Sequence, residues 1–150
     1  MHDDILGPLS LDPRLENVWA GSYPFKGGII KLLVDPEGSD LERALQLARL
    51  ACKRLLLLDE EARKVAAKEL TSTYNDSWRS YMRGDGAEVI NPSLTEADLA
   101  SKLSLCSISI EGPENCSLRY SDNGLFAGHS IFVEYFDGGK FADAWATLYG

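Results

Sequence analysis

Residues 106–135, CSISIEGPENCSLRYSDNGLFAGHSIFVEY, decide the fold of this chain. Apolar and polar side chains alternate along three runs of this stretch, which is the pattern of strands with one buried face. Turn residues separate the runs, with GPEN at 112–115 and DNG at 122–124, and Asn-Gly readily takes the positive φ of tight turns. We therefore expect successive antiparallel strands here, then a turn at 137–139 and a last strand over 141–148 that closes the sheet.

The N-terminal residues 5–35 predict a three-stranded meander. Asp12-Pro13 marks its first turn, because proline fixes φ and removes a hydrogen-bond donor, and residues 24–28 mark the second. The run from Ile29 to Val34 is almost wholly apolar. Such a strand either has both faces covered or lies centrally in the sheet.

The middle of the chain predicts helices. Ser39 and Glu42 fit a capping box, and Asp59 marks a second helix start, since acids favour the N-terminal end of a helix. An apolar residue then recurs every four positions, at Ala62, Ala66, Leu70, Tyr74 and Trp78. We expect an antiparallel helix pair with a tight connection, a single kinked helix being the alternative. The glycines at 84–86 end this region, and Thr95 caps a short third helix that reaches Lys102.

Strands that flank a run of helices indicate the α+β class. The predicted sheet is largely antiparallel and is built from the N-terminal three-strand meander and four C-terminal strands. A central segment of two or three helices packs on one face of it. Residues 1–150 are expected to form a single α+β domain, the alternative being two domains divided near Asp35 or Asn91.

The net charge of −8 bears on the partners of the protein. Nucleic-acid binding needs a basic face, and the basic residues here are interleaved with acids in the helical region, so no nucleic-acid partner is expected. An acidic surface suits a basic protein partner. No apolar run approaches the length of a membrane span, and the N-terminus lacks the layout of a signal peptide, which predicts a cytoplasmic protein without a membrane partner.

The three cysteines, Cys52, Cys106 and Cys116, form no Cys-x-x-Cys pair and are odd in number. This argues against a zinc site and against a disulfide framework. All three fall on apolar faces of predicted elements, where free cysteine packs as a small hydrophobe. No glycine-rich stretch has the pattern of a phosphate-binding loop, so we expect neither a metal nor a cofactor.

Residues Tyr120–Ile131, YSDNGLFAGHSI, resemble the signature of a bacterial family called domain of unknown function 2262. That signature reads Tyr-Asp-Asp-Gly-x-Leu-Phe-x-Gly-His-Ser-Ile, and Ser121 departs from its acidic pattern. Trp78 corresponds to a tryptophan near the end of the family's long helix, and Gly150 to its closing glycine. The resemblance implies the family's fold and a bacterial, intracellular setting, and it implies no reaction.

His129 is the residue of this chain best suited to proton transfer near neutral pH. A weak catalytic hypothesis pairs it with Asp122 or Asp137, whose loops are expected to approach one end of the sheet. The structural interpretation is favoured, because His129 has the same strand parity as the apolar Ile131 and Val133. In that interpretation His129 ties the preceding loop to the sheet.

Two groups of residues are candidates for binding. The first belongs to the loop of the family signature and comprises Asp122, Asn123, Phe126 and His129. The second is Trp19 with Tyr23, which alternation places together on an exposed sheet face, where an aromatic pair would be a contact for a protein partner.

Small size, acidity and the absence of a catalytic cluster favour a non-catalytic protein-interaction module. A concrete form is a bacterial immunity- or antitoxin-like protein that covers a basic toxin with an acidic face. One alternative is a small hydrolase-type enzyme that uses His129 with a nearby aspartate. The other is a small-molecule-binding domain that uses the sheet face opposite the helices.

Overall fold

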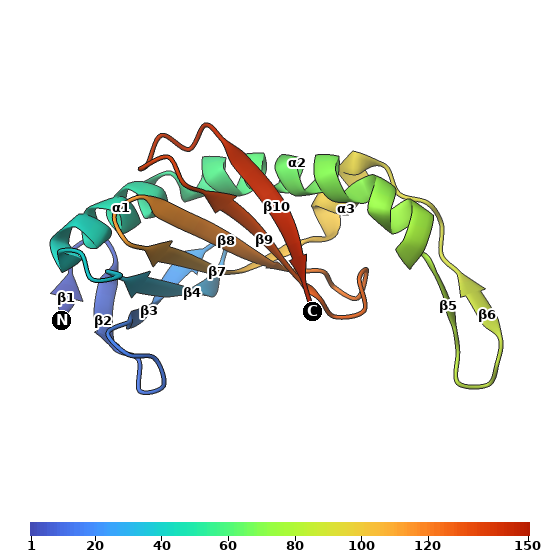
Figure 1. Cartoon of the computed structure of the whole chain (residues 1–150), viewed down its shortest axis with the longest axis horizontal. Helices are drawn as coiled ribbons and strands as arrows, with labels where there is room; N and C mark the ends of the chain where they lie inside the picture. The colour runs from blue at the N-terminus through green and yellow to red at the C-terminus, as the bar shows by residue number, and fades with distance from the viewer.

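The computed structural model describes residues 1–150 and contains one eight-stranded sheet with helices on one face (Figure 1). Its strands lie in the order β1-β2-β3-β4-β7-β8-β9-β10. Their bounds are β1 His2–Asp3, β2 Gly7–Leu11, β3 Trp19–Phe25, β4 Gly28–Asp35, β7 Ser104–Glu111, β8 Asn115–Ser121, β9 Ser130–Tyr135 and β10 Ala144–Tyr149. The N-terminal meander and the four C-terminal strands are therefore confirmed, as is the α+β class.

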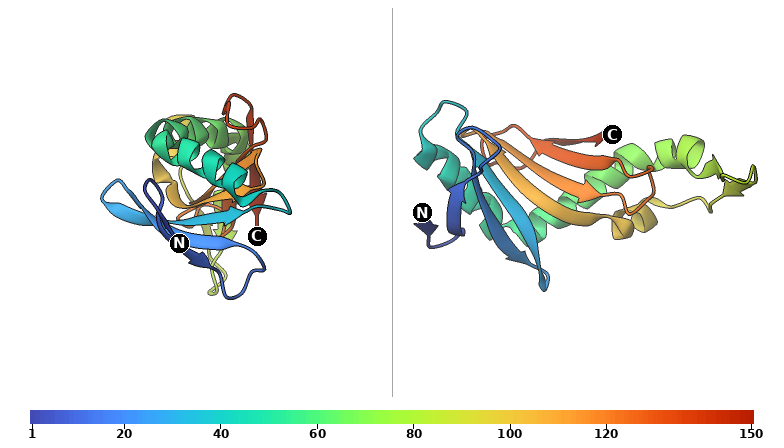
Figure 2. Two further views of the ribbon diagram at one scale, coloured as in Figure 1. Left: turned by 90° about the vertical axis from the view of Figure 1, so that its left-hand side faces the viewer. Right: turned by 90° about the horizontal axis from the view of Figure 1, so that it is seen from below.

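The two halves of the sheet meet along a single parallel pair, β4 with β7, whereas every other neighbouring pair is antiparallel. A parallel pair needs a crossover connection, and the helices supply it. They are α1 Leu41–Lys53, α2 Leu55–Thr73, the one-turn π-helix η1 Tyr74–Trp78, and α3 Glu96–Lys102. Seen from below in Figure 2, the strands lie in front of the helices, so the opposite face of the sheet has no helical cover.

The expected antiparallel helix pair is wrong: α1 and α2 follow one another along the sheet as one kinked helix. Only Arg54 separates them, with φ −105° and ψ 12°. A reversal needs a loop of about 2–5 residues, and no glycine or proline occurs between Ser39 and Arg83 to form one. The predicted helix start at Asp59 is also wrong, because Asp59 lies inside α2.

The predicted cap at the start of α1 is displaced by one residue. Asp40 is the N-cap and accepts a hydrogen bond from the backbone N–H of Glu42, at 3.2 Å. The hydroxyl of Ser39 instead donates to the carbonyl of Pro36, at 2.6 Å. The cap of α3 matches its prediction, since Thr95 and Asp98 form a reciprocal capping box.

The core lies between the inner face of the sheet and the helices. Leu32, Val34, Ile108 and Leu118 are among its fully buried residues. Strand β4 lies centrally in the sheet, which confirms one of the two predicted alternatives. Only one of its faces is covered, as the 75% exposure of Ile29 shows. The outer face of this strand is open to solvent.

The prediction that Cys106 lies on the apolar face of its strand is wrong, because β7 contains a β-bulge at this point. The register with β8 shifts between Leu105 and Ser107, so the alternation that holds from Ile108 onward does not extend back to Cys106. Cys106 is half-buried and lies outside the core, whereas Cys52 and Cys116 are buried in it. All three thiols are free.

A second, two-stranded sheet consists of β5 Ser80–Met82 and β6 Glu88–Ile90, which pair antiparallel. This hairpin extends away from the body at the end of the long helix (Figure 1). Its apolar side chains Tyr81, Met82 and Ile90 are exposed. The glycines at its tip were expected only to end the helical region.

Candidate functional site

The loop of the family signature is organised by the carboxylate of Asp122. Asp122 is buried and accepts hydrogen bonds from the backbone N–H groups of Gly124, Phe126 and Gly128, at 2.9, 2.7 and 3.1 Å. Both carboxylate oxygens are therefore used inside the loop. Asp122 holds the loop in shape and forms no hydrogen bond with the His129 ring.

His129 lies half-buried at the end of this loop. Its Nδ1 donates to the carbonyl of Phe126, since a carbonyl can only accept. The ring packs edge-on against Trp78, with ring centroids 5.1 Å apart. On another side it contacts Gly150 so closely that a Cβ on that glycine would overlap the imidazole. These contacts tie the loop to η1 and to the end of β10, while a ligand-binding role of His129 stays a prediction.

The remaining loop candidates make structural contacts as well. Phe126 is fully buried and packs edge-on against Tyr74 and Trp78, so it offers no binding surface. Asn123 has φ 48° and donates through Nδ2 to the carbonyl of Lys102, at 2.6 Å, and to the hydroxyl of Ser104, at 2.9 Å. The loop is thus fastened to η1, to the end of α3 and to the start of β7.

The expectation that Asp122 and Asp137 approach the same end of the sheet is wrong. Asp122 precedes β9 and Asp137 follows it, so the two loops lie at opposite ends of that strand. Six strand residues span about 20 Å, which separates Asp137 from His129. Asp137 instead accepts from the backbone N–H groups of Phe141, Ala142 and Asp143.

The exposed aromatic pair predicted at Trp19 and Tyr23 is also wrong. In the register of β3 with β4, Trp19 lies opposite Val34 and Tyr23 lies opposite Ile30, and both partners are buried in the core. Directly opposed residues of an antiparallel pair share a face. The two aromatic side chains are accordingly half-buried under α1, and the Tyr23 hydroxyl donates to the carbonyl of Cys52, at 3.3 Å.

A buried charged centre, which the sequence did not reveal, lies around Asp59. Its carboxylate is fully buried and accepts from Lys26 at 2.8 Å, from Arg63 at 3.0 Å and from the Tyr120 hydroxyl at 2.8 Å. Burial alone would raise the pKa of Asp59, but these hydrogen bonds outweigh it and hold the pKa below its ordinary value. The only sequence signal was the spacing of Asp59 and Arg63, four apart on a helix.

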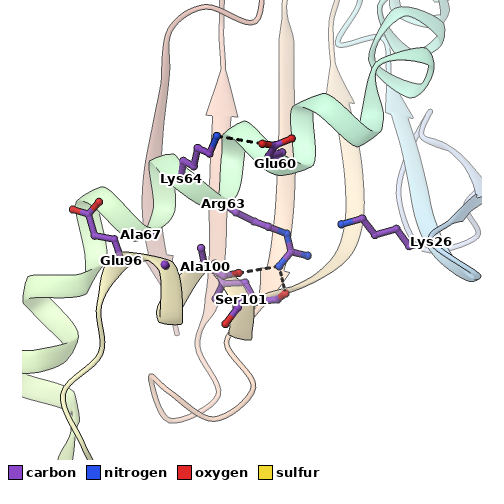
Figure 3. Close-up of a pocket in the computed structure, with 10 residues that line it drawn as sticks. Lys26, Glu60, Arg63, Lys64, Ala67, Glu96, Ala100 and Ser101 are labelled. Atoms are coloured by element: carbon purple, nitrogen blue, oxygen red, sulfur yellow. Dashed lines mark hydrogen bonds and ion pairs between the residues drawn. The ribbon is translucent and has the colours of Figure 1, made fainter.

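A cleft of about 700 Å³ opens beside this centre, between α2 and α3 (Figure 3). Arg63 and Lys26 form one end of it, and Figure 3 shows their charged groups pointing toward one another. Arg63 also donates through Nη1 to the carbonyls of Ala100, at 3.0 Å, and Leu103. Lys64 pairs with Glu60 at the cleft's edge, at 3.2 Å.

The outer face of the sheet carries a second hollow, a groove of about 720 Å³ across β7, β8, β9 and the end of β10. It is lined by polar and aromatic side chains that project from alternate positions of these strands. They include Ser109, Glu111, Ser117, Arg119, Ser130, Phe132, Glu134 and Tyr149. The groove is therefore a surface of the sheet itself, whose other face is the core.

One end of this outer face is acidic and aromatic. Glu134 lies opposite Ser117 on one side and Trp145 on the other, so all three project outward. Phe136 stacks on Trp145, with centroids 4.8 Å apart and planes at 25°, and both rings are exposed. Desolvation, with the carboxylates of Glu37, Glu134 and Asp35 as further contributors, raises the pKa of Glu111 above its ordinary value.

Two general features complete the description of possible sites. No group of three or more His, Cys, Asp or Glu side chains is arranged to hold a metal ion. None of the helices combines the length and the apolar character that crossing a membrane requires.

A comparison with protein families finds one match along nearly the whole chain. A family described as "Uncharacterized protein conserved in bacteria (DUF2262)" matches residues 3–145. This is the family that the signature loop resembles, and the matched range includes the Asp59 centre, the cleft beside it and all of the groove lining except Tyr149 and Gly150. No curated protein and no solved structure matches the chain.

Proposed function

This chain belongs to the DUF2262 family of uncharacterized bacterial proteins, and we propose that it is a non-catalytic interaction module that binds a basic protein partner through the outer face of its sheet. The observation that carries the proposal is the acidic and aromatic end of that face. There Glu111 and Glu134 lie beside the exposed stack of Phe136 on Trp145. No helix covers this surface.

The chemistry of this end suits arginine or lysine side chains. Carboxylates attract a cation, and the face of an exposed tryptophan or phenylalanine adds a cation–π contact worth about 0.5–2 kcal/mol. No side chain of the chain itself forms a salt bridge with Glu111 or Glu134. Desolvation raises the pKa of Glu111, and repulsion from the neighbouring carboxylates adds to it; a cation from a partner would relieve that repulsion.

An immunity-type protein is the specific form of this proposal. Such a protein would cover a basic toxin with the acidic face and so block the toxin's contacts with its own target. The net charge of −8 favours rapid, electrostatically steered association with a basic partner. The proposed setting is the bacterial cytoplasm, where the three free thiols would stay reduced.

The hydrolase alternative receives less support from the arrangement of its residues. The Asp122 carboxylate already accepts hydrogen bonds from three backbone N–H groups. Asp137 lies at the opposite end of β9 from His129. An aspartate–histidine pair is therefore not assembled from the residues that the hypothesis names.

The test is binding of a nona-arginine peptide, measured by isothermal titration calorimetry at low and at physiological salt. The double variant Glu111→Gln with Glu134→Gln should bind at least tenfold more weakly than the wild type, and Trp145→Ala should also weaken binding. Asp85→Asn with Glu88→Gln is the matched control, because it likewise removes two exposed carboxylates, both from the distant hairpin. A similar loss in the control would mean that only net charge matters, and the proposed face would be abandoned.

A further inference from the structure

We propose that the cleft between α2 and α3 is a binding site for a small monocarboxylate, which Lys26 and Arg63 hold by its charged end. The cleft lies on the helix-covered side of the sheet, away from the face assigned to a protein partner. The proposal therefore does not depend on the proposed function.

Positive charge exceeds negative charge at the end of the cleft that Lys26 and Arg63 form. Lys26 and Arg63 bring two positive charges, and the buried carboxylate of Asp59 supplies one negative charge between them. Asp59 stays ionised because its hydrogen bonds outweigh the effect of burial. One positive charge is left over at this end of the cleft, because Lys64 is paired with Glu60 and Glu96 stands at the opposite edge (Figure 3). A single carboxylate would neutralise it.

Arg63 and Lys26 are held in place and still have N–H donors that make no hydrogen bond. Arg63 donates through Nε to both oxygens of Asp59, and through Nη1 to two carbonyls at the end of α3. Its Nη2 makes no hydrogen bond and points toward Lys26 (Figure 3). Lys26 uses one of its three donors on Asp59. A guanidinium fixed in this way needs little further ordering to bind an anion.

The rest of the cleft lining selects the kind of anion. Beyond the cations the wall consists of the short or apolar side chains Ala67, Ala97, Ala100 and Leu103, which suit an aliphatic chain. The volume of about 700 Å³ lies within the range of about 300–1,000 Å³ that small-ligand sites occupy. Glu60 and Glu96 stand at the edges and disfavour a doubly charged phosphate.

The test uses butanoate as the probe, with inorganic phosphate and 1-butanol as comparison ligands. Binding is followed by the amide chemical shifts of residues 97–103 in ¹⁵N-labelled protein. Butanoate should give saturable shifts there, 1-butanol should give none, and phosphate should bind at least tenfold more weakly than butanoate. Phosphate binding as tightly as butanoate would overturn the assignment to monocarboxylates.

Variants of the two lining lysines separate the proposed contact from general attraction. Lys26→Gln should weaken butanoate binding at least tenfold, and Lys26→Arg should restore it. Lys64→Gln is the matched control, because Lys64 lines the same cleft but is paired with Glu60, and it should bind within twofold of the wild type. Equal losses in both glutamine variants, or no saturable shifts in the wild type, would overturn the proposal. The Glu111→Gln and Glu134→Gln variant should bind butanoate normally, so failure of one proposal is distinguishable from failure of the other.

Discussion

The hydroxyl of Tyr120 donates a 2.8 Å hydrogen bond to Oδ1 of Asp59, and both side chains are completely buried. This bond connects β8 to α2 across the core. The guanidinium of Arg63 lies over the Tyr120 ring, at 5.4 Å from its centroid, so the aromatic ring also borders the charged centre. Helix α2, the sheet and α3 are thus joined at one polar point inside the core.

Removing the Tyr120 hydroxyl should weaken this junction. We expect Tyr120→Phe to lower the free energy of unfolding by about 1–2 kcal/mol, since a buried hydrogen bond to a charged group is lost while the ring still packs. Asp59→Ala should cost more, about 3–5 kcal/mol, because it removes the counter-charge of the largely buried Arg63 and the acceptor of the Lys26 and Tyr120 hydrogen bonds. Urea denaturation measures both.

Tyr149→Phe is the matched control for Tyr120→Phe, because the Tyr149 side chain is exposed and makes no hydrogen bond. Its unfolding free energy should stay within about 0.5 kcal/mol of the wild type. Equal effects of the two tyrosine variants would contradict the role assigned to the buried bond.

The free energy of unfolding should depend on pH through the carboxyl group of Asp3. It accepts from Arg49 at 2.7 and 2.9 Å and from the backbone N–H groups of Ile5 and Leu6. Although burial opposes it, these bonds lower the pKa of Asp3 to about 2. A lowered folded-state pKa stabilises the protein above the unfolded value of about 3.9, and this contribution is lost as the pH falls toward 2.

The variant Asp3→Asn should therefore lose about 1–2 kcal/mol at pH 7, and less as the pH falls below 4. Asp4→Asn is its control, because Asp4 is exposed and makes no side-chain hydrogen bond. Unfolding free energies at pH 7, 4 and 2.5 give the comparison. An Asp3→Asn deficit that stays constant over this range would refute the assignment.

The signature loop should lose its shape when Asp122 is removed. Asp122→Ala leaves three backbone N–H groups without an acceptor, and we expect a loss of about 2–4 kcal/mol in unfolding free energy. Hydrogen exchange should accelerate most at the amides of Gly124, Phe126 and Gly128, beyond the smaller increase that the lower unfolding free energy gives the core amides. Asp76→Ala, at an exposed position of η1, should leave exchange in the loop unchanged.

The β5–β6 hairpin should be dispensable for folding. The backbone N–H of Asn91 donates to the carbonyl of Arg79, at 2.7 Å, so the chain enters and leaves the hairpin at adjacent points. Replacing residues 80–90 with two glycines should therefore change the melting temperature by only a few degrees. A molten or aggregated product would show that the hairpin contributes to the core, contrary to its exposed side chains.

Local patterns predicted the parts of the fold that local chemistry controls. Alternation in β8 and β9 gave the right inward residues, and the Thr95 box gave the start of α3, because each depends on residues close in sequence. The single kinked helix was only the alternative prediction, although the lack of glycine and proline around Arg54 argued against a reversal. The bulge near Cys106 was missed because it is a property of the pairing between two strands.

The candidate sites were harder to predict, since they depend on which strands become neighbours. Asp122 and Asp137 fall in similar glycine-containing loops, and only the strand order shows that these loops lie at opposite ends of β9. Lys26 and Tyr120 are far from Asp59 in sequence, so their convergence required the folded sheet. Acidity was visible from composition, but its concentration beside Phe136 and Trp145 was not.

The parallel pairing of β4 with β7 has a consequence for how the chain can be divided. A cut in the β5–β6 turn, at residues 84–86, would yield one fragment with β1 to β4, α1 and α2, and another with α3 and β7 to β10. Each fragment would retain a complete set of antiparallel partners, and the only broken strand pairing would be the β4–β7 seam, with β5–β6 at the cut itself. The fold is thus suited to fragment complementation, in which two separately made halves reassemble along the β4–β7 seam and through the contacts of α2 with α3, β8 and β10.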